Sequence, residues 1–174
     1  MPTKWFEVEE SGGPAVGADG GRLDSGPAEG SEVSFTGEFR HTIDAKGRLI
    51  VPSRMRDEFT GDAVVLTKWL NNCVAMWSRE GWTDLEQSLR QLGRSSANAR
   101  SFVRTVAASA HPDEIDRQGR INVPPHLRGY AGVERDVVVV GVFDRAEIWN
   151  PDRWAEEQAR GEDRMDELVQ GLDF

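Results

Sequence analysis

Residues 43–52 read IDAKGRLIVP and residues 115–124 read IDRQGRINVP, so one decapeptide occurs in two versions 72 positions apart. Ten positions agree at this single offset, and no gap is needed between residue 43 and residue 82. The agreeing pairs are Ile43 and Ile115, Asp44 and Asp116, Gly47 and Gly119, Arg48 and Arg120, Val51 and Val123, Pro52 and Pro124, Arg56 and Arg128, Val65 and Val137, Trp77 and Trp149, and Trp82 and Trp154. Because self-similarity at a fixed period indicates a repeated structural unit, we expect two copies of one unit.

The same order of elements is predicted in both copies. An extended stretch precedes the turn, and a short strand, a short helix, a pair of strands and a longer helix follow it. In the first copy these elements are expected at residues 37–43, 49–51, 52–61, 63–68 with 74–77, and 79 to about 93. In the second copy they are expected at residues 107–115, 121–123, 124–132, 136–143 with 147–149, and from 151. A further helix over residues 97–105 connects the copies.

Several residues mark where the helices begin and end. Pro52 and Pro124 suit the first position of a helix, where a missing N–H group costs nothing. Gly61 and Gly132 are expected to end the short helices. Ser78 and Asn150 are expected to cap the N-termini of the longer helices with their side chains.

Large apolar side chains are expected in the core. In the helix after residue 78 they recur every three or four positions, at Trp82, Leu85, Leu89 and Leu92. The repeat also places tryptophans at equivalent positions, which favours shared packing over a binding cage. These tryptophans are Trp77, Trp82, Trp149 and Trp154. We interpret both sets as packing residues.

Composition excludes several classes of protein. The chain has 174 residues, of which 38% are hydrophobic and 29% charged, as in ordinary globular proteins. It has no apolar run long enough to span a membrane and no secretory leader pattern, so we expect a cytoplasmic protein without a membrane partner. The single Cys73 can form neither an internal disulfide nor a cysteine-rich zinc site, and we expect a buried, inert thiol.

The charge is unevenly distributed along the chain. The formal net charge is −9 overall, with −5 in residues 1–34, −5 in residues 150–174 and +1 in residues 35–149. Within the middle part, residues 35–56 carry a net charge of +3. A small basic region is therefore embedded in an acidic protein, which leaves a polyanionic partner open.

The repeated turn has a physical logic in both copies. The side chains of Asp44 and Asp116 can accept backbone N–H groups and fix the turn, and Gly47 and Gly119 can adopt the positive φ that it demands. The arginines that follow, Arg48 and Arg120, then project from a rigid loop where they can contact phosphates or guanine edges. The alternative is that each arginine pairs with the aspartate of its own turn.

At this point the sequence resembles the MraZ family, over residues 35 to about 154. The resemblance rests on FTGEFRHTIDAKGRLIVPSRMR in the first copy and on ARSFVRTVAASAHPDEIDRQGRINVPPHLR with VVVVGVFDRAEIWN in the second. It implies an α+β fold of two tandem AbrB-like swapped-hairpin units that form a pseudo-two-fold β-barrel with flanking helices. The expected parts are a disordered acidic, glycine-rich extension (1–34), a first unit (35–92), a connecting helix (93–106), a second unit (107–154) and an acidic tail (155–174).

The resemblance also implies a function. MraZ proteins regulate transcription of the bacterial division and cell-wall gene cluster by binding direct repeats in promoter DNA, and they assemble into rings of eight or more subunits. Carried over to this chain, the expected role is a nucleoid-associated repressor. The residues expected to contact double-stranded DNA are Arg40, Lys46, Arg48, Arg117 and Arg120. The second turn has Gln118 where the first has Lys46, so its contribution to DNA binding is expected to be smaller.

The extension over residues 1–34 departs from the family pattern, because such proteins begin just before the equivalent of Phe35. Its net charge of −5 motivates the hypothesis that it competes with DNA for the basic turns.

Two other classes of function are weighed against DNA binding. A metal or acid–base site could use His41, His111, Asp113 and Glu114, yet neither histidine recurs at the repeat offset. We therefore expect no enzyme, no cofactor, no metal and no small-molecule substrate. The second alternative is a scaffold or antitoxin-like module that binds only proteins, because fold does not fix function.

Overall fold

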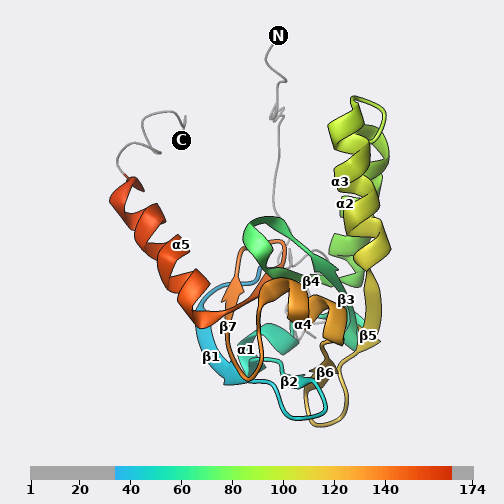
Figure 1. Cartoon of the computed structure of the whole chain (residues 1–174). Coiled ribbons are helices and arrows are strands. Elements are labelled where there is room, and N and C mark those ends of the chain that lie inside the picture. Colours follow the sequence, from blue (N-terminus) through green and yellow to red (C-terminus); the bar gives the residue numbers. More distant parts are fainter. Residues whose placement is uncertain (1–33, 166–174) are drawn as a thin grey trace, which may run out of the picture. The chain divides into compact units, whose positions relative to one another are not determined.

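The computed structural model describes residues 34–165, and the predictions for residues 1–33 and 166–174 lie outside this range (Figure 1). The strands are β1 (Glu38–Thr42), β2 (Arg48–Ile50), β3 (Ala63–Lys68), β4 (Val74–Ser78), β5 (His111–Glu114), β6 (Arg120–Asn122), β7 (Asp136–Gly141) and β8 (Ala146–Trp149). The α-helices are α1 (Ser53–Arg56), α2 (Arg79–Leu92), α3 (Ala97–Ser109), α4 (Pro125–Ala131) and α5 (Pro151–Asp163). Short 3₁₀ turns lie at Thr60–Asp62 and Leu70–Asn72. This is the expected mixed α+β composition.

The strands form two antiparallel sheets. The larger sheet has the order β1-β7-β8-β4-β3-β5, and the smaller one pairs β2 with β6. In the smaller sheet, Arg48 lies opposite Asn122, Leu49 opposite Ile121 and Ile50 opposite Arg120. We call this smaller sheet the β2–β6 ribbon.

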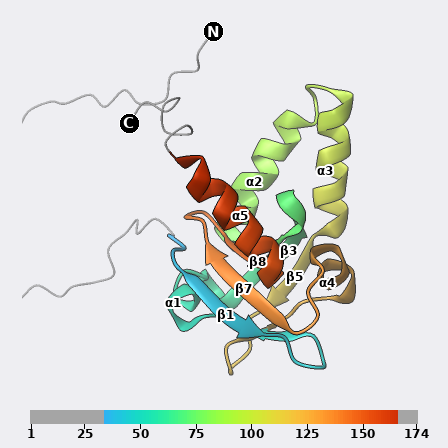
Figure 2. The same ribbon diagram turned by 60° about the vertical axis from the view of Figure 1, so that its left-hand side comes forward.

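The pairing of strands follows the sequence repeat. Strands β1 to β4 of the first copy correspond to β5 to β8 of the second. The first strand of each copy pairs with the third strand of the other, β1 with β7 and β5 with β3. The second strands pair with each other, and so do the fourth strands, β4 with β8. Figure 2 shows β1 and β7 side by side along one edge.

The two copies share the main hydrophobic core. Leu49 and Ile121, the central residues of the β2–β6 ribbon, are 0% and 2% exposed and belong to a cluster with residues of both copies. Because the copies exchange strands and share this core, neither has a core of its own.

Long helices begin at the expected caps. The Ser78 hydroxyl accepts a hydrogen bond from the N–H group of Gly81 at 3.0 Å. The Asn150 side chain accepts hydrogen bonds from Asp152 and Arg153 at 3.0 and 3.2 Å. Both side chains satisfy N–H groups that the first turn of a helix leaves without partners.

The short helix of the first copy corrects two expectations. Helix α1 ends at Arg56, and Gly61 lies beyond it in a 3₁₀ turn. The helix ends early because Phe59 adopts an extended backbone and turns into the core, where its ring packs 4.8 Å from that of Phe35. Pro52 precedes the helix rather than starting it, because its extended backbone continues from β2. In the second copy, Pro124 likewise precedes the helix, which starts at Pro125, whereas Gly132 ends α4 with a left-handed backbone, as expected.

Helix α3 is longer than expected, which shortens the extended stretch that follows it. It continues to Ser109, so β5 begins at His111 rather than at residue 107. Ser109 is buried, and its hydroxyl accepts a hydrogen bond from the Lys68 N–H group at 2.9 Å. This contact with β3 accounts for the extra helical turn.

The apolar stripe of α2 is only partly core. Leu89 is buried, whereas Leu92 is 42% exposed and Trp82 is half-buried. Helices α2 and α3 form a hairpin that extends away from the sheets, so the outer part of the stripe has little to pack against (Figure 1). Among the repeated tryptophans, Trp77 and Trp149 are buried.

Cys73 is buried, as predicted, and its burial raises the pKa of the thiol. Within residues 34–165, no helix is both long enough and apolar enough to cross a membrane.

Candidate nucleic-acid interface

The turn of the first copy is held by the carboxylate of Asp44. One oxygen, Oδ1, accepts hydrogen bonds from the N–H groups of Lys46 and Arg48, both at 2.9 Å. The Gly47 N–H group donates to the Asp44 carbonyl at 2.9 Å, and Gly47 has a φ of +85°. A residue with a Cβ rarely adopts such a backbone, so glycine is needed at this position.

The turn of the second copy repeats this geometry. Asp116 Oδ1 accepts the N–H groups of Gln118 at 2.8 Å and Arg120 at 3.0 Å. The Gly119 N–H group donates to the Asp116 carbonyl at 2.8 Å, and Gly119 has a φ of +75°. Two equivalent rigid turns therefore lie at the starts of β2 and β6.

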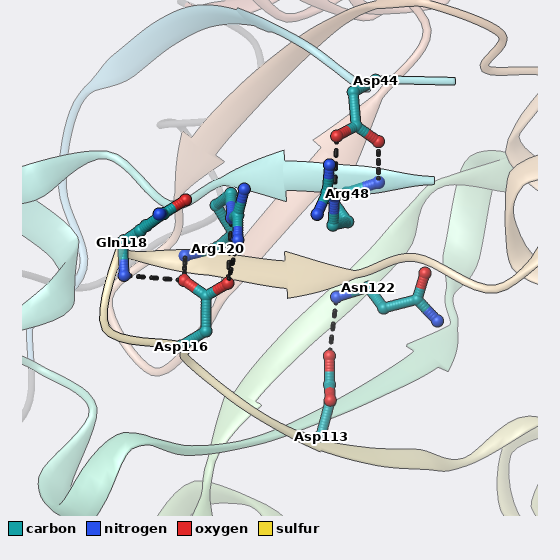
Figure 3. Close-up of polar contacts among 7 residues, drawn as sticks. All are labelled: Asp44, Arg48, Asp113, Asp116, Gln118, Arg120 and Asn122. Atoms are coloured by element: carbon teal, nitrogen blue, oxygen red, sulfur yellow. Dashed lines mark hydrogen bonds and ion pairs between the residues drawn. The ribbon is translucent and has the colours of Figure 1, made fainter. Parts of the chain in front are cut away.

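Each arginine pairs with the aspartate of its own turn (Figure 3). Arg48 Nε donates to Asp44 Oδ2 at 2.7 Å. Arg120 reaches Asp116 Oδ2 through Nε at 2.9 Å and through Nη2 at 2.7 Å. This is the arrangement that the sequence left open as the alternative. It orients both guanidinium groups and leaves their side chains 36% and 25% exposed.

These contacts favour the charged form of both carboxylates. The Arg48 N–H group, and then its guanidinium, lower the pKa of Asp44 below its usual value. The Arg120 guanidinium, and then its N–H group, lower the pKa of Asp116. Both carboxylates therefore stay ionised at neutral pH, and each turn is held as a charge-assisted pair.

Alternation along the β2–β6 ribbon separates an inner and an outer face. Leu49 and Ile121 point into the core, so their neighbours on both strands point outward. The outward residues are Arg48, Ile50, Arg120 and Asn122. The outer face thus carries two arginines that are already oriented by the turns.

Two further cations lie within the turns themselves. Lys46 in the first turn and Arg117 in the second are exposed, and their side chains form no hydrogen bond or ion pair with any residue the structure describes. Arg40 is also exposed, but it lies on β1 in a groove that Asp136 and Asp152 also line. The structure therefore places four of the five predicted residues on the ribbon and its turns, and Arg40 apart from them.

Support for each turn comes from the other copy, a feature that the turn motif alone did not predict. The Val123 N–H group donates to the Gly47 carbonyl, and the Val51 N–H group donates to the Gly119 carbonyl, both at 2.8 Å. Arg128 Nε donates to the Val123 carbonyl at 3.0 Å behind the first turn. Its repeat partner Arg56 packs behind Gly119. The sequence feature that could have predicted this support is the agreement of Arg56 with Arg128 at the 72-residue offset.

Asp113 is a further residue of the ribbon whose role the sequence did not predict, because the sequence suggested Asp113 only for an acid–base site. Its Oδ2 atom accepts the N–H group of Asn122 at 2.6 Å, which fixes the end of β6 (Figure 3). The histidines of that proposed site are not brought together, because His41 lies on β1 and His111 on β5, at opposite edges of the larger sheet. In the part of the chain that the structure describes, no three His, Cys, Asp or Glu residues are grouped to hold a metal.

Comparison with known proteins gives a consistent picture. A family model described as "MraZ protein, putative antitoxin-like" matches residues 34–105 and again residues 106–169. A protein of Moorella thermoacetica named Transcriptional regulator MraZ is 47% identical over 138 residues, which cover 79% of this chain and 96% of that protein. Proteins with the same name are 44% identical in Ligilactobacillus salivarius, over 79% of this chain and 96% of theirs, and 45% identical in Acetivibrio thermocellus, over 75% and 90%.

Proposed function

Because the chain belongs to the MraZ family, we propose that it is a transcriptional regulator that binds double-stranded promoter DNA through the β2–β6 ribbon and its two turns. The observation that carries this proposal is the outer face of the ribbon, where two equivalent turns present oriented arginines beside the exposed cations Lys46 and Arg117. The relatives named as transcriptional regulators support the role.

The geometry suits the major groove. A two-stranded antiparallel ribbon is one of the elements that the groove admits, and arginine is the side chain that most often reads guanine there. Since Arg48 and Arg120 are held by Asp44 and Asp116, less side-chain entropy is lost when they contact DNA. Lys46 and Arg117 are positioned to contact phosphates. Phosphate contacts fix the orientation of the protein on the duplex.

The two copies are related in a way that bears on the fold and on assembly. The exchange of β1 and β5 between the copies supports a pair of swapped-hairpin units related by a pseudo-two-fold axis. We propose that copies of the chain assemble into a ring of eight or more subunits. The ring binds direct repeats in the promoter of the division and cell-wall gene cluster and represses transcription of that cluster. It acts in the cytoplasm, at the nucleoid. In a ring, several modest basic faces act together through effective concentration, which offsets the chain's net charge of −9.

The test is a titration of the full chain against a promoter fragment with tandem repeats and against a scrambled fragment, at two salt concentrations. Specific binding that weakens with salt is expected for the wild type. Arg48→Ala should abolish the preference for the repeats without changing the assembly state. The double variant Lys46→Ala with Arg117→Ala should weaken binding to both fragments and flatten the salt dependence. The logarithmic slope should change by about 0.9 for each phosphate that the variant no longer neutralises.

The matched control is Arg160→Ala, which removes one positive charge from α5, where Arg160 pairs with Glu157. It should bind like the wild type. Arg40→Ala should have a smaller effect than Lys46→Ala because acidic residues share the groove of Arg40. Equal binding by every variant would contradict the assignment to the ribbon. No binding by the wild type would favour the scaffold or antitoxin-like module.

A further inference from the structure

The four outward side chains of the β2–β6 ribbon form a compact square. Arg48 lies opposite Asn122, and Ile50 lies opposite Arg120, so the arginines occupy one diagonal of the square and Ile50 and Asn122 the other. Residues directly opposite each other in such a pair have Cβ atoms about 5 Å apart. All four can therefore face the same short stretch of a ligand.

The two diagonals differ in symmetry. The repeat exchanges Arg48 with Arg120, which are identical and are held by identical turns. It also exchanges Ile50 with Asn122, of which the first is apolar and the second carries a hydrogen-bonding amide. The ribbon is therefore symmetric in its charged anchors and asymmetric in the side chains between them.

Both side chains of the asymmetric diagonal are available to a ligand. Ile50 is 48% exposed, on a surface otherwise lined by polar and charged groups. Asn122 is also exposed, and its backbone rather than its side chain engages Asp113. Figure 3 shows the Asn122 amide directed away from Asp113, and it forms no hydrogen bond with another residue between 34 and 165.

We infer that Ile50 and Asn122 select bases in addition to the arginines, with Ile50 selecting thymine and Asn122 selecting adenine on opposite sides of the recognised unit. This inference rests on the proposed function. The thymine methyl is the apolar group that the major-groove edges of the bases offer to an isoleucine. An asparagine amide matches the N6 and N7 atoms of adenine with two hydrogen bonds.

One consequence concerns the form of the operator. If the two sides of the ribbon carried the same side chains, the preferred unit would have two-fold symmetry, as palindromic operators do. With Ile50 on one side and Asn122 on the other, the preferred unit has a direction. Such units form direct repeats when they are bound by copies of the chain that lie in the same orientation along the DNA.

The experiment is a selection of binding sites by the full chain from a pool of duplexes with randomised positions. The wild type is compared with Ile50→Asn, Asn122→Ile, the double exchange of the two residues, and the conservative variant Ile50→Val. All substituted side chains are exposed, but the Asn122 amide lies beside Gly47 of the first turn, so circular dichroism and urea denaturation verify that each variant folds. Lys46→Ala serves as the control because it should weaken binding without changing the selected bases.

The expected result is a change in base preference of roughly tenfold at single positions. Ile50→Asn should convert one thymine preference to adenine, Asn122→Ile should convert the adenine preference to thymine, and Ile50→Val should retain the thymine. The double exchange should restore a unit with a direction, because it again places one isoleucine and one asparagine on the two sides of the ribbon. If Ile50→Asn and Asn122→Ile both select the wild-type motif, the inference is overturned while the proposed function stands. If the wild type selects no motif, both are overturned.

Discussion

The guanidinium group of Arg56, a residue of the first copy, packs against Gly119 in the turn of the second copy. A Cβ atom at position 119 would lie 2.5 Å from Arg56 Nη1 and 2.9 Å from its Cζ. The reciprocal contact is looser, because a Cβ atom at Gly47 would lie 3.5 Å from Arg128 Nε. Each turn of the proposed DNA-binding face thus depends on an arginine of the other copy.

From this contact we predict that Gly119→Ala destabilises the protein. The substitution imposes a left-handed backbone on a residue with a Cβ, which costs about 1–2 kcal/mol, and it also displaces Arg56. The free energy of unfolding, measured by urea denaturation, should fall by at least this amount. DNA binding should weaken at concentrations where the protein remains folded, because the turn carries Arg120.

Gly129→Ala is the matched control. Gly129 lies within α4, nothing lies within 4 Å of an added Cβ, and alanine favours the helix over glycine by about 1 kcal/mol. This variant should be as stable as the wild type or more so. Combining Gly119→Ala with Arg56→Ala should cost less than the sum of the two single changes. Strict additivity would show that Arg56 does not constrain the turn.

The repeated aspartates lead to a prediction about pH. Both pKa values are lowered in the folded protein, so each carboxylate stabilises the fold fully above its ordinary pKa of 3.8, and this contribution is lost as the pH falls through the lower folded value. Asp44→Asn and Asp116→Asn should therefore reduce stability at pH 7, and the difference from the wild type should shrink as the pH falls below 3.8 and through the lower folded pKa values. Chemical denaturation across this range measures it.

Asp57→Asn provides the comparison for this series. Asp57 is an exposed aspartate directly after α1, and its side chain has no hydrogen-bond or ion-pair partner in residues 34–165. Its substitution should leave the free energy of unfolding unchanged across the pH range. A difference that persists below the folded pKa values would show that the aspartates act through something other than their charge.

Much of the fold could be predicted from local signals. The repeated decapeptide predicted the order of elements in both copies, because turn residues and helix caps such as Ser78 act on their immediate neighbours. The end of α3 was wrong because a distant residue determines it, through the contact of Ser109 with β3. The end of α1 was wrong for a similar reason, since Phe59 is drawn into the core against Phe35.

The candidate site was predictable in composition but not in arrangement. The spacing of Asp44 and Arg48 allowed both an internal pair and a free guanidinium, and only the three-dimensional structure shows the pair. The apposition of Ile50 with Arg120 depends on the pairing of strands from different copies, which no local pattern encodes. The exposure of Ile50 follows from that pairing, because its neighbour Leu49 takes the inward position.

A buried ion pair beside the larger sheet gives a third prediction. Glu147 is 7% exposed and accepts hydrogen bonds from Arg145 Nε at 2.9 Å and from the Trp149 indole at 3.0 Å. The Arg145 guanidinium also lies over the ring of Trp77, 5.4 Å from its centroid. Arg145→Ala would leave a buried carboxylate without its cation, so the free energy of unfolding should fall by about 3 kcal/mol.

Arg90→Ala is the control for this variant. Arg90 pairs with Glu86 on α2, where the two side chains are 72% and 45% exposed, so its removal should cost less than about 1 kcal/mol. Adding Glu147→Gln to Arg145→Ala should restore part of the stability, because the buried group then carries no charge. If the double variant is no more stable than Arg145→Ala, the destabilisation comes from packing on the tryptophans and not from the unpaired carboxylate.

The acidic extension gives the last prediction. Residues 1–33 precede Ser34, whose N–H group donates to the carboxylate of Glu58 at 2.9 Å, close to the end of α1. Residues 1–34 carry a net charge of −5 and should compete with phosphates for the cations of the turns. A chain that starts at Ser34 should therefore bind promoter DNA more tightly than the full chain, most clearly at low salt.

The same measurement separates competition from a general effect of net charge. A full-length variant with the acids at positions 7, 9 and 10 changed to glutamine keeps the length of the extension and removes three negative charges. Under competition it should approach the affinity of the truncated chain, and both increases in affinity should disappear as salt screens the attraction. Equal affinity of the full and truncated chains at every salt concentration would contradict the competition. An increase on truncation that the glutamine variant does not share would assign the effect to the bulk of the extension.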